Sequence, residues 1–290
     1  MIHNKTACAV IWYNPSLTEI QNITTYSSFF EKVYIVDNSD SDNKELAEKI
    51  TNSVYIPNGK NLGIAAATNT GCQKAYNDGF ELCMTMDQDS TWDADFLELY
   101  LKKTAENQSD QTAVFAPAMK VSSDSFSIIG DIKRFFIKEK PLPDEQFVET
   151  VISSGNIINL KIWEKIGKFT EKLFIDEVDF DFCFRLVLSG YKILKFNYIF
   201  FNHTLGIPKK SLFPLTHSHH GKRCYYISRN KRYIIAQYPE FARKYNYSLI
   251  LKLFLLGKIL TLQFDDAGYI IRGKKDYRNN IFGEYKATNE

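Results

Sequence analysis

Three short apolar runs alternate with segments of helical composition near the start of the chain, and this alternation restricts the fold more than any other feature. The runs are Ala7–Tyr13, Val33–Val36 and Val54–Ile56. The segments between them predict helices over Leu17–Phe30 and Lys44–Thr51. Strands that alternate with helices at this spacing predict a parallel α/β sheet with right-handed connections.

A fourth apolar run, Phe80–Met86, stops abruptly at two carboxylates, Asp87 and Asp89. Residues at i and i+2 of an extended chain point the same way, so both side chains could bind one divalent cation, a chemistry suited to a diphosphate. The spacing alone is not specific, and the position after a buried strand distinguishes this pair, because open α/β sheets bind ligands at the carboxyl ends of their strands. Other pairs with the same spacing are Asp40/Asp42 and Asp93/Asp95.

The composition is that of a globular protein. The chain has 290 residues, is 44% hydrophobic and has a formal net charge of +2. It can bury a full core as one large domain or as a domain with an appendage, and it has no block of like charge that would indicate a nucleic-acid binder. The five cysteines are odd in number and widely separated, which predicts reduced core thiols. The N-terminal residues lack the long apolar region of a signal peptide, so a cytoplasmic location is expected.

The stretch Asn61–Gly71 begins with flexible, amide-bearing residues and continues into an alanine-rich helix that should reach about Asp78. A helix start preceded by Gly and Asn offers backbone N–H groups and a favourable dipole to an anion. The alternative is a helix that packs tightly on the sheet because its side chains are small. No G-x-G-x-x-G follows the first strand, so the pattern is not a dinucleotide-binding fingerprint.

Four motifs in this order resemble the nucleotide-sugar-binding half of inverting glycosyltransferases of family 2. They are Tyr13-Asn14-Pro15, Val36-Asp37-Asn38-Ser39, Asn61-Leu62-Gly63-Ile64-Ala65 with Asn69-Thr70-Gly71, and Asp87-Gln88-Asp89-Ser90. The last motif is particularly similar to bacterial rhamnosyltransferases of that family. The resemblance implies a GT-A-type α/β fold, with a Rossmann-like, mixed and mostly parallel sheet flanked by helices and a helical C-terminal appendage.

The resemblance also implies roles for residues of these motifs. Asp37 would contact a pyrimidine base, and Asp87 with Asp89 would hold Mg²⁺ or Mn²⁺ against the diphosphate of a nucleotide sugar. The other residues that would line this donor site are Tyr13, Asn14, Asn61, Gly63 and Asn69.

The middle of the chain predicts further elements of the same sheet. A helix is expected over Ala94–Ala105, a strand over Ala113–Pro117, and a loop or hairpin region over Ser122–Thr150. Val151–Asn159 predicts a strand, a glycine bend and a second strand, followed by a helix over Lys161–Ile166. By the resemblance, three residues of the bend would border the sugar and the acceptor, although an ordinary turn would have the same sequence: Ser154, Gly155 and Asn156.

A second acidic cluster lies in Leu173–Arg185, where acids crowd the first turn of a predicted helix. Their simplest role is to compensate the helix dipole, and Asp181 with Arg185 fits an i, i+4 surface pair. The surrounding aromatic residues leave little polar face, so some of these acids should lie in a partly dry cleft, where a carboxylate can act as a base. The run resembles the acid-rich motif of the same family. In that motif the residue matching Asp179 takes the proton of the acceptor hydroxyl. Asp181 and Arg185 support it, and Asp181 would lie on the acceptor side.

Two histidines are candidate metal ligands. His203 follows a predicted strand over Ile193–Phe201, and it matches a family position that completes the metal shell, although a lone His is more often structural. His217 is the second candidate. It opens a stretch similar to rhamnosyltransferases, in which Arg229 or Arg223 would contact phosphate oxygens.

The tail changes character, because Tyr247–Phe264 is dominated by Leu, Ile and Phe. Such a helix could dock on the core, form a homo-oligomer contact, or attach shallowly to the inner face of the cell membrane. A membrane span is disfavoured by Lys252, Lys258 and Gly257. The polar end from Arg272 to Glu290 is expected to fray.

These patterns predict a nucleotide-sugar-binding domain over residues 1–235 and a helical region over 236–290. The resemblance implies an inverting, metal-dependent glycosyltransferase that moves L-rhamnose from dTDP-rhamnose to a hydroxyl of a growing surface polysaccharide or lipid-linked glycan. The alternative within the class is a galactofuranosyl or other hexosyl transferase that uses a UDP-sugar. The alternative outside it is a catalytically silent, sugar-nucleotide-binding scaffold of an assembly complex.

Overall fold

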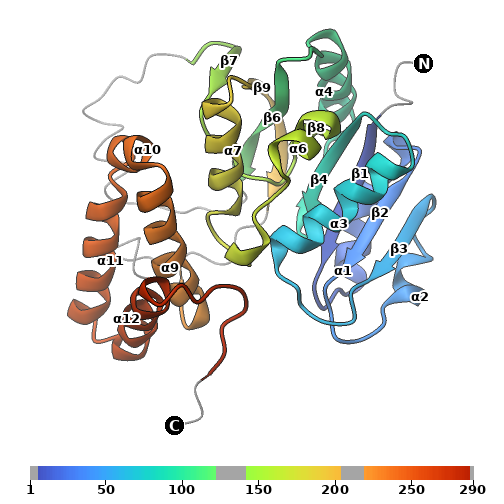
Figure 1. Cartoon of the computed structure of the whole chain (residues 1–290). Helices are drawn as coiled ribbons and strands as arrows, with labels where there is room; N and C mark the ends of the chain where they lie inside the picture. Colours follow the sequence, from blue (N-terminus) through green and yellow to red (C-terminus); the bar gives the residue numbers. More distant parts are fainter. Residues whose placement is uncertain (1–5, 122–141, 204–218, 288–290) are drawn as a thin grey trace. The chain divides into compact units, whose positions relative to one another are not determined.

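The structure is a computed structural model and describes residues 6–121, 142–203 and 219–287, which form two compact units (Figure 1). Residues 6–121, 142–171 and 178–203 form the first unit, and residues 172–177 with 219–287 form the second. The expected boundary at residue 235 differs from this division. The physical reason is that helix α9 (Lys222–Gln237) packs against α12 (Phe264–Arg278) of the second unit.

One mixed sheet is the centre of the first unit, as expected. Within the described residues it has nine strands in the order β3-β2-β1-β4-β8-β6-β9-β5, and β7 pairs with β9. The strands β3, β2, β1 and β4 are parallel, whereas β8 is antiparallel to both β4 and β6. The strand bounds are β1 Thr6–Trp12, β2 Val33–Asp37, β3 Ser53–Pro57, β4 Leu82–Asp87, β5 Ser90–Thr91, β6 Thr112–Val121, β7 Glu145–Val148, β8 Ile157–Asn159 and β9 Lys192–His203.

Helices cover both faces of the sheet, which explains why β1 is apolar throughout. Val10 and Trp12 lie in the large core that also contains buried residues of α1 (Leu17–Thr24) and α4 (Ala94–Glu106). The intervening Ile11 packs with Ala67 of α3 (Ile64–Asn77), which crosses the parallel strands in Figure 1. Every residue of β1 is therefore buried, as in a central parallel strand. The remaining short elements of this unit are η1 Ser27–Phe29, α2 Lys44–Ala47, α6 Leu160–Ile166 and α7 Val178–Leu188. A further short helix, η2 (Glu171–Leu173), begins at the last residue of this part of the unit and continues into the second unit.

Some expected elements are shorter than the sequence pattern suggested. The helix expected over Leu17–Phe30 ends at Thr24, and the helix expected over Lys44–Thr51 ends at Ala47. The strand expected from Val151 to the glycine bend is wrong, because residues 151–156 form no strand and β8 begins at Ile157. Gly155 has φ +84°, a left-handed conformation that interrupts an extended strand.

Gly71 allows α3 to lie close to the sheet. A Cβ atom at this position would be 2.7 Å from Ala9 Cβ and 3.3 Å from Val36 Cγ2. We therefore expect Gly71→Ala to destabilise the protein by about 1–3 kcal/mol, the usual cost of overpacking, measured from the midpoint of urea unfolding. Gly268→Ala is the matched control, since a Cβ there has no heavy atom within 4 Å and the helix should be unchanged or slightly stabilised. Equal stabilities of the two variants would contradict this account of the contact.

The second unit is helical where the structure describes it. Helix α12 crosses α9 so closely that a Cβ at Gly273 would lie 3.1 Å from the backbone nitrogen of Arg229. Tyr225 donates a hydrogen bond to Asp276 Oδ2 at 2.9 Å. The expected fraying from Arg272 onward is therefore wrong, because this end of α12 is anchored by a buried contact. The expected single helix over Tyr247–Phe264 is also two elements, and the helix bounds are α9 Lys222–Gln237, α10 Pro239–Lys244, α11 Tyr247–Leu260 and α12 Phe264–Arg278.

Candidate functional site

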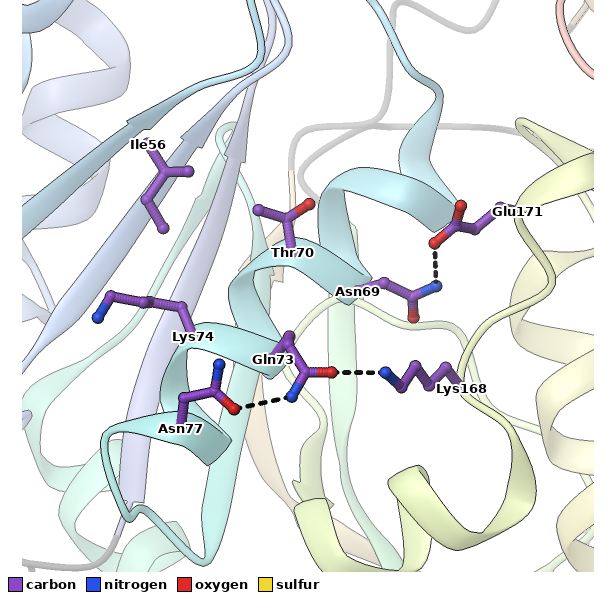
Figure 2. Close-up of a pocket in the computed structure, with 8 residues that line it drawn as sticks. All are labelled: Ile56, Asn69, Thr70, Gln73, Lys74, Asn77, Lys168 and Glu171. Atoms are coloured by element: carbon purple, nitrogen blue, oxygen red, sulfur yellow. Dashed lines mark hydrogen bonds between the residues drawn. The ribbon is translucent and has the colours of Figure 1, made fainter.

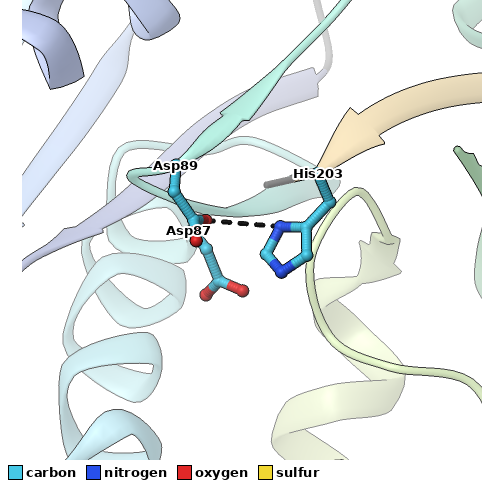
Figure 3. A group of neighbouring side chains, drawn as sticks. All are labelled: Asp87, Asp89 and His203. Carbon is cyan, nitrogen blue, oxygen red and sulfur yellow. Dashed lines mark ion pairs between the residues drawn. The ribbon is translucent and has the colours of Figure 1, made fainter. Parts of the chain in front are cut away.

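Three expected metal ligands lie together at one edge of the sheet. Asp87 is the last residue of β4, Asp89 follows in the turn, and His203 is the last residue of β9. One ligand atom from each lies within 4.8 Å of the other two, and Figure 3 shows the three side chains converging. The strand pairing produces this meeting, because β5 pairs Ser90 with His203 immediately after the acids.

The atoms of this cluster fit a divalent cation. Oδ1 of Asp89 is buried and accepts no hydrogen bond, although it lies 3.3 Å from Nδ1 of His203. A buried carboxylate oxygen without a hydrogen bond is costly unless a cation or a proton compensates it. Ser90 Oγ lies 2.8 Å from the same His203 nitrogen and thereby orients the ring. Carboxylates suit Mg²⁺ and Mn²⁺, and imidazole is a common ligand of transition metals.

Two consecutive serines join the two acidic clusters that the sequence predicted. Ser154 Oγ accepts a hydrogen bond from the backbone N–H of Asp87 at 3.1 Å and lies 3.1 Å from Ser90 Oγ. The backbone N–H of Ser153 donates to Asp179 Oδ2 at 3.1 Å. Asp87 and Asp179 are therefore neighbours across a shared pair of residues, although they are far apart in the sequence.

The bend that carries these serines is fixed to β4. Thr85 donates from its hydroxyl to the Ser153 carbonyl at 2.7 Å, and Gly155 N–H donates to the Thr85 carbonyl at 2.8 Å. Asn156 is buried, and its side-chain amide donates to the carbonyl of Ile152. Of the three expected acceptor-side residues in this bend, Ser154 thus lies nearest to the acids, while Gly155 and Asn156 shape the turn.

Asp181 and Arg185 form the expected i, i+4 ion pair, but not on the surface. The side chain of Asp181 is 0% exposed, and its Oδ2 accepts from Thr170 Oγ1 at 2.6 Å and from Arg185 Nε at 3.1 Å. Arg185 also donates to the carbonyls of Ile166 and Lys168. The pair therefore ties α7 to the end of α6, and an acceptor contact of Asp181 stays a prediction.

A polar network forms the edge of the sheet beyond β2. Asp37 is buried, and its two oxygens accept from Ser39 N–H, Asn43 Nδ2 and the Tyr55 hydroxyl, all at 2.8–2.9 Å. Burial and the hydrogen bond to Asp37 raise the pKa of Tyr55, so this hydroxyl remains a donor. Ser39 Oγ in turn accepts from the backbone N–H of Asn14. Asp37 therefore organises this edge, and its expected contact with a base stays a prediction.

Asn61 and Gly63 lie in the same network. Asn61 Oδ1 accepts from Gly63 N–H at 2.9 Å, and Gly63 has φ +85° before the first turn of α3. Asn38, which the sequence did not single out, donates to the carbonyl of Gly63 at 3.1 Å and accepts from Asn58. The expected turn at the start of α3 is thus present and rigid.

Asn69 lies on another side of α3, in an open pocket of about 490 Å³ (Figure 2). Its amide is buried and exchanges two hydrogen bonds of 2.9 Å with the backbone of Phe169. It also donates to Glu171, and the neighbouring Gln73 accepts from Lys168. These contacts join α3 to the segment after α6, so the observed partners of Asn69 are structural and its donor contact stays a prediction.

Gln88, between the two acids, is a residue that sequence reasoning missed. Its side-chain amide accepts from the backbone N–H of Tyr13 at 2.7 Å and donates to the carbonyl of Tyr13 at 3.2 Å. The turn that carries Asp87 and Asp89 is thereby attached to the end of β1, where the Tyr13 ring is 50% exposed. The position of Gln88 between two candidate metal ligands was the signal available in the sequence. The position of Ser90 beside Asp89 was a similar signal.

Arg229 lies in the second unit and is 0% exposed. Its guanidinium donates to the carbonyls of Leu173 at 2.9 Å and Gly283 at 2.7 Å, and it lies over the Tyr226 ring. The observed arginine therefore binds backbone carbonyls, and its expected phosphate contact stays a prediction. His217 lies outside the described residues.

The sequence of the chain is similar to known glycosyl transferases. The sequence profile of glycosyl transferase family 2 matches residues 16–170. A curated relative, "dTDP-rhamnosyl transferase RfbF" of Shigella flexneri, is 30% identical over 190 residues. This match covers 62% of the chain and 62% of the relative. The chain thus spans less than two thirds of that relative's length.

Solved structures of similar architecture include GalNAc-T7 and TarS. GalNAc-T7, solved with UDP, GalNAc and Mn²⁺, superposes with a TM-score of 0.55 at 13% identity over 89% of this chain and 57% of that one. TarS of S. aureus superposes with a TM-score of 0.52 at 17% identity over 87% of this chain and 43% of that one. At these identities the likeness concerns the fold alone.

Proposed function

This chain belongs to glycosyl transferase family 2 and has its GT-A-type fold, and from that premise we propose that it transfers a sugar from a nucleoside diphosphate to an acceptor hydroxyl. The observation that carries the proposal is the pair Ser153 and Ser154, which contacts the proposed base and the proposed metal ligands at once. A cation site beside a carboxylate base is what a single displacement at an anomeric carbon requires.

The residues divide the reaction between them. Asp87, Asp89 and His203 would hold Mg²⁺ or Mn²⁺, which supplies positive charge to the diphosphate oxygens when bound. Asp179 takes the proton of the acceptor hydroxyl while that oxygen bonds to the anomeric carbon and the bond to the diphosphate breaks. Ser153 N–H orients Oδ2 of this carboxylate. The sugar configuration inverts because the acceptor approaches opposite the leaving group, and no covalent enzyme intermediate forms.

The donor we propose is dTDP-L-rhamnose, since the curated relative is a dTDP-rhamnosyl transferase and the Asp-Gln-Asp-Ser motif is similar to such enzymes. The acceptor would be a growing surface polysaccharide or lipid-linked glycan on the cytoplasmic side of the membrane. A UDP-sugar donor is the second candidate, because Asp37 and its neighbours would accept either pyrimidine.

The test is donor binding and turnover by the full chain. Purified protein is mixed with dTDP-rhamnose, UDP-galactofuranose or UDP-glucose, with and without Mn²⁺, and the melting temperature is measured. Release of nucleoside diphosphate is then measured after addition of a bacterial membrane extract, which supplies acceptor hydroxyls. A donor at about one hundred times its Kd should stabilise the fold by about 2.7 kcal/mol. Stabilisation and turnover with the thymidine donor support the proposal, and preference for a uridine donor supports the second candidate. Binding without turnover indicates a scaffold, and no stabilisation by any donor contradicts the proposal.

The second unit also has an apolar helix face for which we propose a lipid surface as partner. Leu249, Leu253, Leu256 and Leu260 are about half exposed and follow each other at helical spacing along α11. This helix contains no acidic residue, and its exposed charge, Lys252, suits anionic headgroups. Among the described helices, none is long and apolar enough to cross a bilayer.

Replacing Leu253 and Leu256 together by Gln should lower binding to phosphatidylglycerol vesicles about tenfold or more, because each leucine loses part of the roughly 1.5–3 kcal/mol of its burial. Co-sedimentation measures the bound fraction. The control is Leu17→Gln with Leu142→Gln, two exposed leucines of the first unit. Equal vesicle binding by the two double variants would argue against this surface. If the Leu253 and Leu256 double variant instead loses a dimer that the wild type forms, the face binds a second copy of the chain.

A further inference from the structure

The residues just before α7 form a short segment, Lys172–Glu177, that belongs by its contacts to the second unit. We call this segment the strap. Its neighbours in the chain on both sides, Glu171 and Val178, belong to the first unit. One residue, Val178, separates the strap from Asp179. The strap therefore leads directly into α7.

The strap has an unusual backbone. Phe174, Asp176 and Glu177 have φ of +67°, +62° and +64°, in the left-handed region that side chains disfavour. None of the three is Gly or Asn. A segment with three such residues keeps its conformation only where the surrounding structure imposes it, and such strain is typical of functional sites.

Helix α9 supplies the contacts that impose this conformation. Arg223, Tyr226 and Asn230 follow each other at i, i+3 and i+7, so they share one face of the helix. Arg223 donates to Asp176 Oδ1 at 3.1 Å, and the Tyr226 ring stacks on Phe174 with centroids 5.2 Å apart. All these contacts lie within the second unit.

Asn230 makes the central contact. It is 0% exposed, and its Nδ2 donates to the carbonyls of Leu173 at 2.9 Å, Ile175 at 2.7 Å and Asp176 at 2.9 Å. Its Oδ1 accepts from Arg229 Nε at 2.9 Å, which fixes which end of the amide faces the strap. Since an amide nitrogen has two hydrogens, three carbonyls share them, and the strap must curve around this one atom.

The last strap residue is held by its side chain. Glu177 is buried, and its carboxylate accepts from Lys231 Nζ and, at 2.8 Å, from the hydroxyl of Tyr247. The residue next to Val178 is therefore fixed in both backbone conformation and side-chain direction.

We propose that Asn230 is a positioning residue for the base Asp179: by holding three carbonyls of the strap it sets the start of α7, and with it the place of the carboxylate. This inference rests on the proposed function. It assigns a role in the reaction to a residue of α9, a helix of the second unit. The strap contains none of the residues proposed to hold the donor, so the effect should appear in turnover rather than in donor affinity.

The test is Asn230→Asp, an isosteric change that replaces the donating amide nitrogen by an oxygen facing three carbonyls. We expect kcat to fall about 10–100-fold, the usual cost of misplacing a catalytic group by about 1 Å, with the KM and Kd of the donor unchanged. Hydrogen–deuterium exchange of the strap peptide should become faster. Gln237→Glu is the matched control, an amide-to-carboxylate change at an exposed position of the same helix, and it should retain wild-type kcat.

The outcomes separate this inference from the proposed function. Faster strap exchange with unchanged kcat in Asn230→Asp would overturn the positioning role, as would unchanged exchange and unchanged kcat. If this variant loses donor binding or does not fold, Tyr247→Phe decides, because it removes only the hydroxyl that donates to Glu177. We expect it to speed strap exchange and lower kcat about threefold to tenfold, and an unchanged kcat would overturn the inference. Absence of turnover in the wild type would contradict the proposed function, whereas the exchange comparison would still show whether Asn230 holds the strap.

Discussion

Asp179→Asn should lower kcat by about 10²–10⁴-fold, the range usually contributed by a general base, while the donor still binds. The asparagine cannot take the acceptor proton, yet its Oδ1 can accept the hydrogen bond that Ser153 N–H donates to Asp179 Oδ2. The local geometry should therefore persist, and the loss should be chemical. Initial rates at saturating donor and acceptor measure kcat, and thermal shift with the nucleotide sugar measures binding.

Asp110→Asn is the matched control, because Asp110 is exposed and lies just before β6. Its rates should equal those of the wild type. A kcat within threefold of wild type in Asp179→Asn would show that another group takes the proton. Loss of donor binding in that variant would instead mean that the carboxylate supports the fold of the donor site.

Asp89→Asn should lower kcat/KM by about 10²-fold or more and raise the Mn²⁺ concentration needed for half-maximal rate. The neutral amide removes one negative charge from the site, and the charge stabilisation that a bound cation supplies is worth several kcal/mol. Oδ1 of Asp89 accepts no hydrogen bond from the described residues, so the other contact that the change weakens is the one at 3.3 Å to His203 Nδ1. Titration of metal-free protein with Mn²⁺ measures both quantities.

Asp95→Asn is the control for this variant, because Asp93 and Asp95 form a second pair at the same spacing but lie at the start of α4. We expect it to leave the Mn²⁺ titration unchanged. Removal of metal by chelation should abolish wild-type turnover, and added Mn²⁺ should restore it. Wild-type turnover that persists after chelation would contradict metal dependence. Asp87 and Asp89 would then have a role other than metal binding.

The sequence allowed the first half of the sheet and the acidic edge to be predicted, because both depend on local patterns. Strands β1, β2 and β4 are covered on both faces, so they read as continuous apolar runs. Parallel strands bring their carboxyl ends to one edge, which placed Asp87 and Asp89 correctly. His203 joins them through the pairing of β5 with β9, and its position after a strand was the signal.

Other parts depend on contacts between distant residues and could not be predicted in the same way. The resemblance suggested a phosphate contact for Arg229. Its guanidinium instead lies in the interior, where charged side chains are seldom found, and backbone carbonyls and aromatic rings surround it. The polar end of the chain suggested fraying, but Asp276 accepts from Tyr225, 51 positions earlier. Composition does not reveal such partners.

The two serines of the bend after residue 152 have a mechanical consequence. The Ser154 hydroxyl binds the proposed metal ligand Asp87, and the N–H of the adjacent Ser153 binds the proposed base Asp179, so a displacement of this bend would move both together. The separation between the proposed metal site and the proposed base would thereby depend on this bend rather than on the acceptor. Variation in acceptor preference among such enzymes would then have to come from substitutions outside this bend.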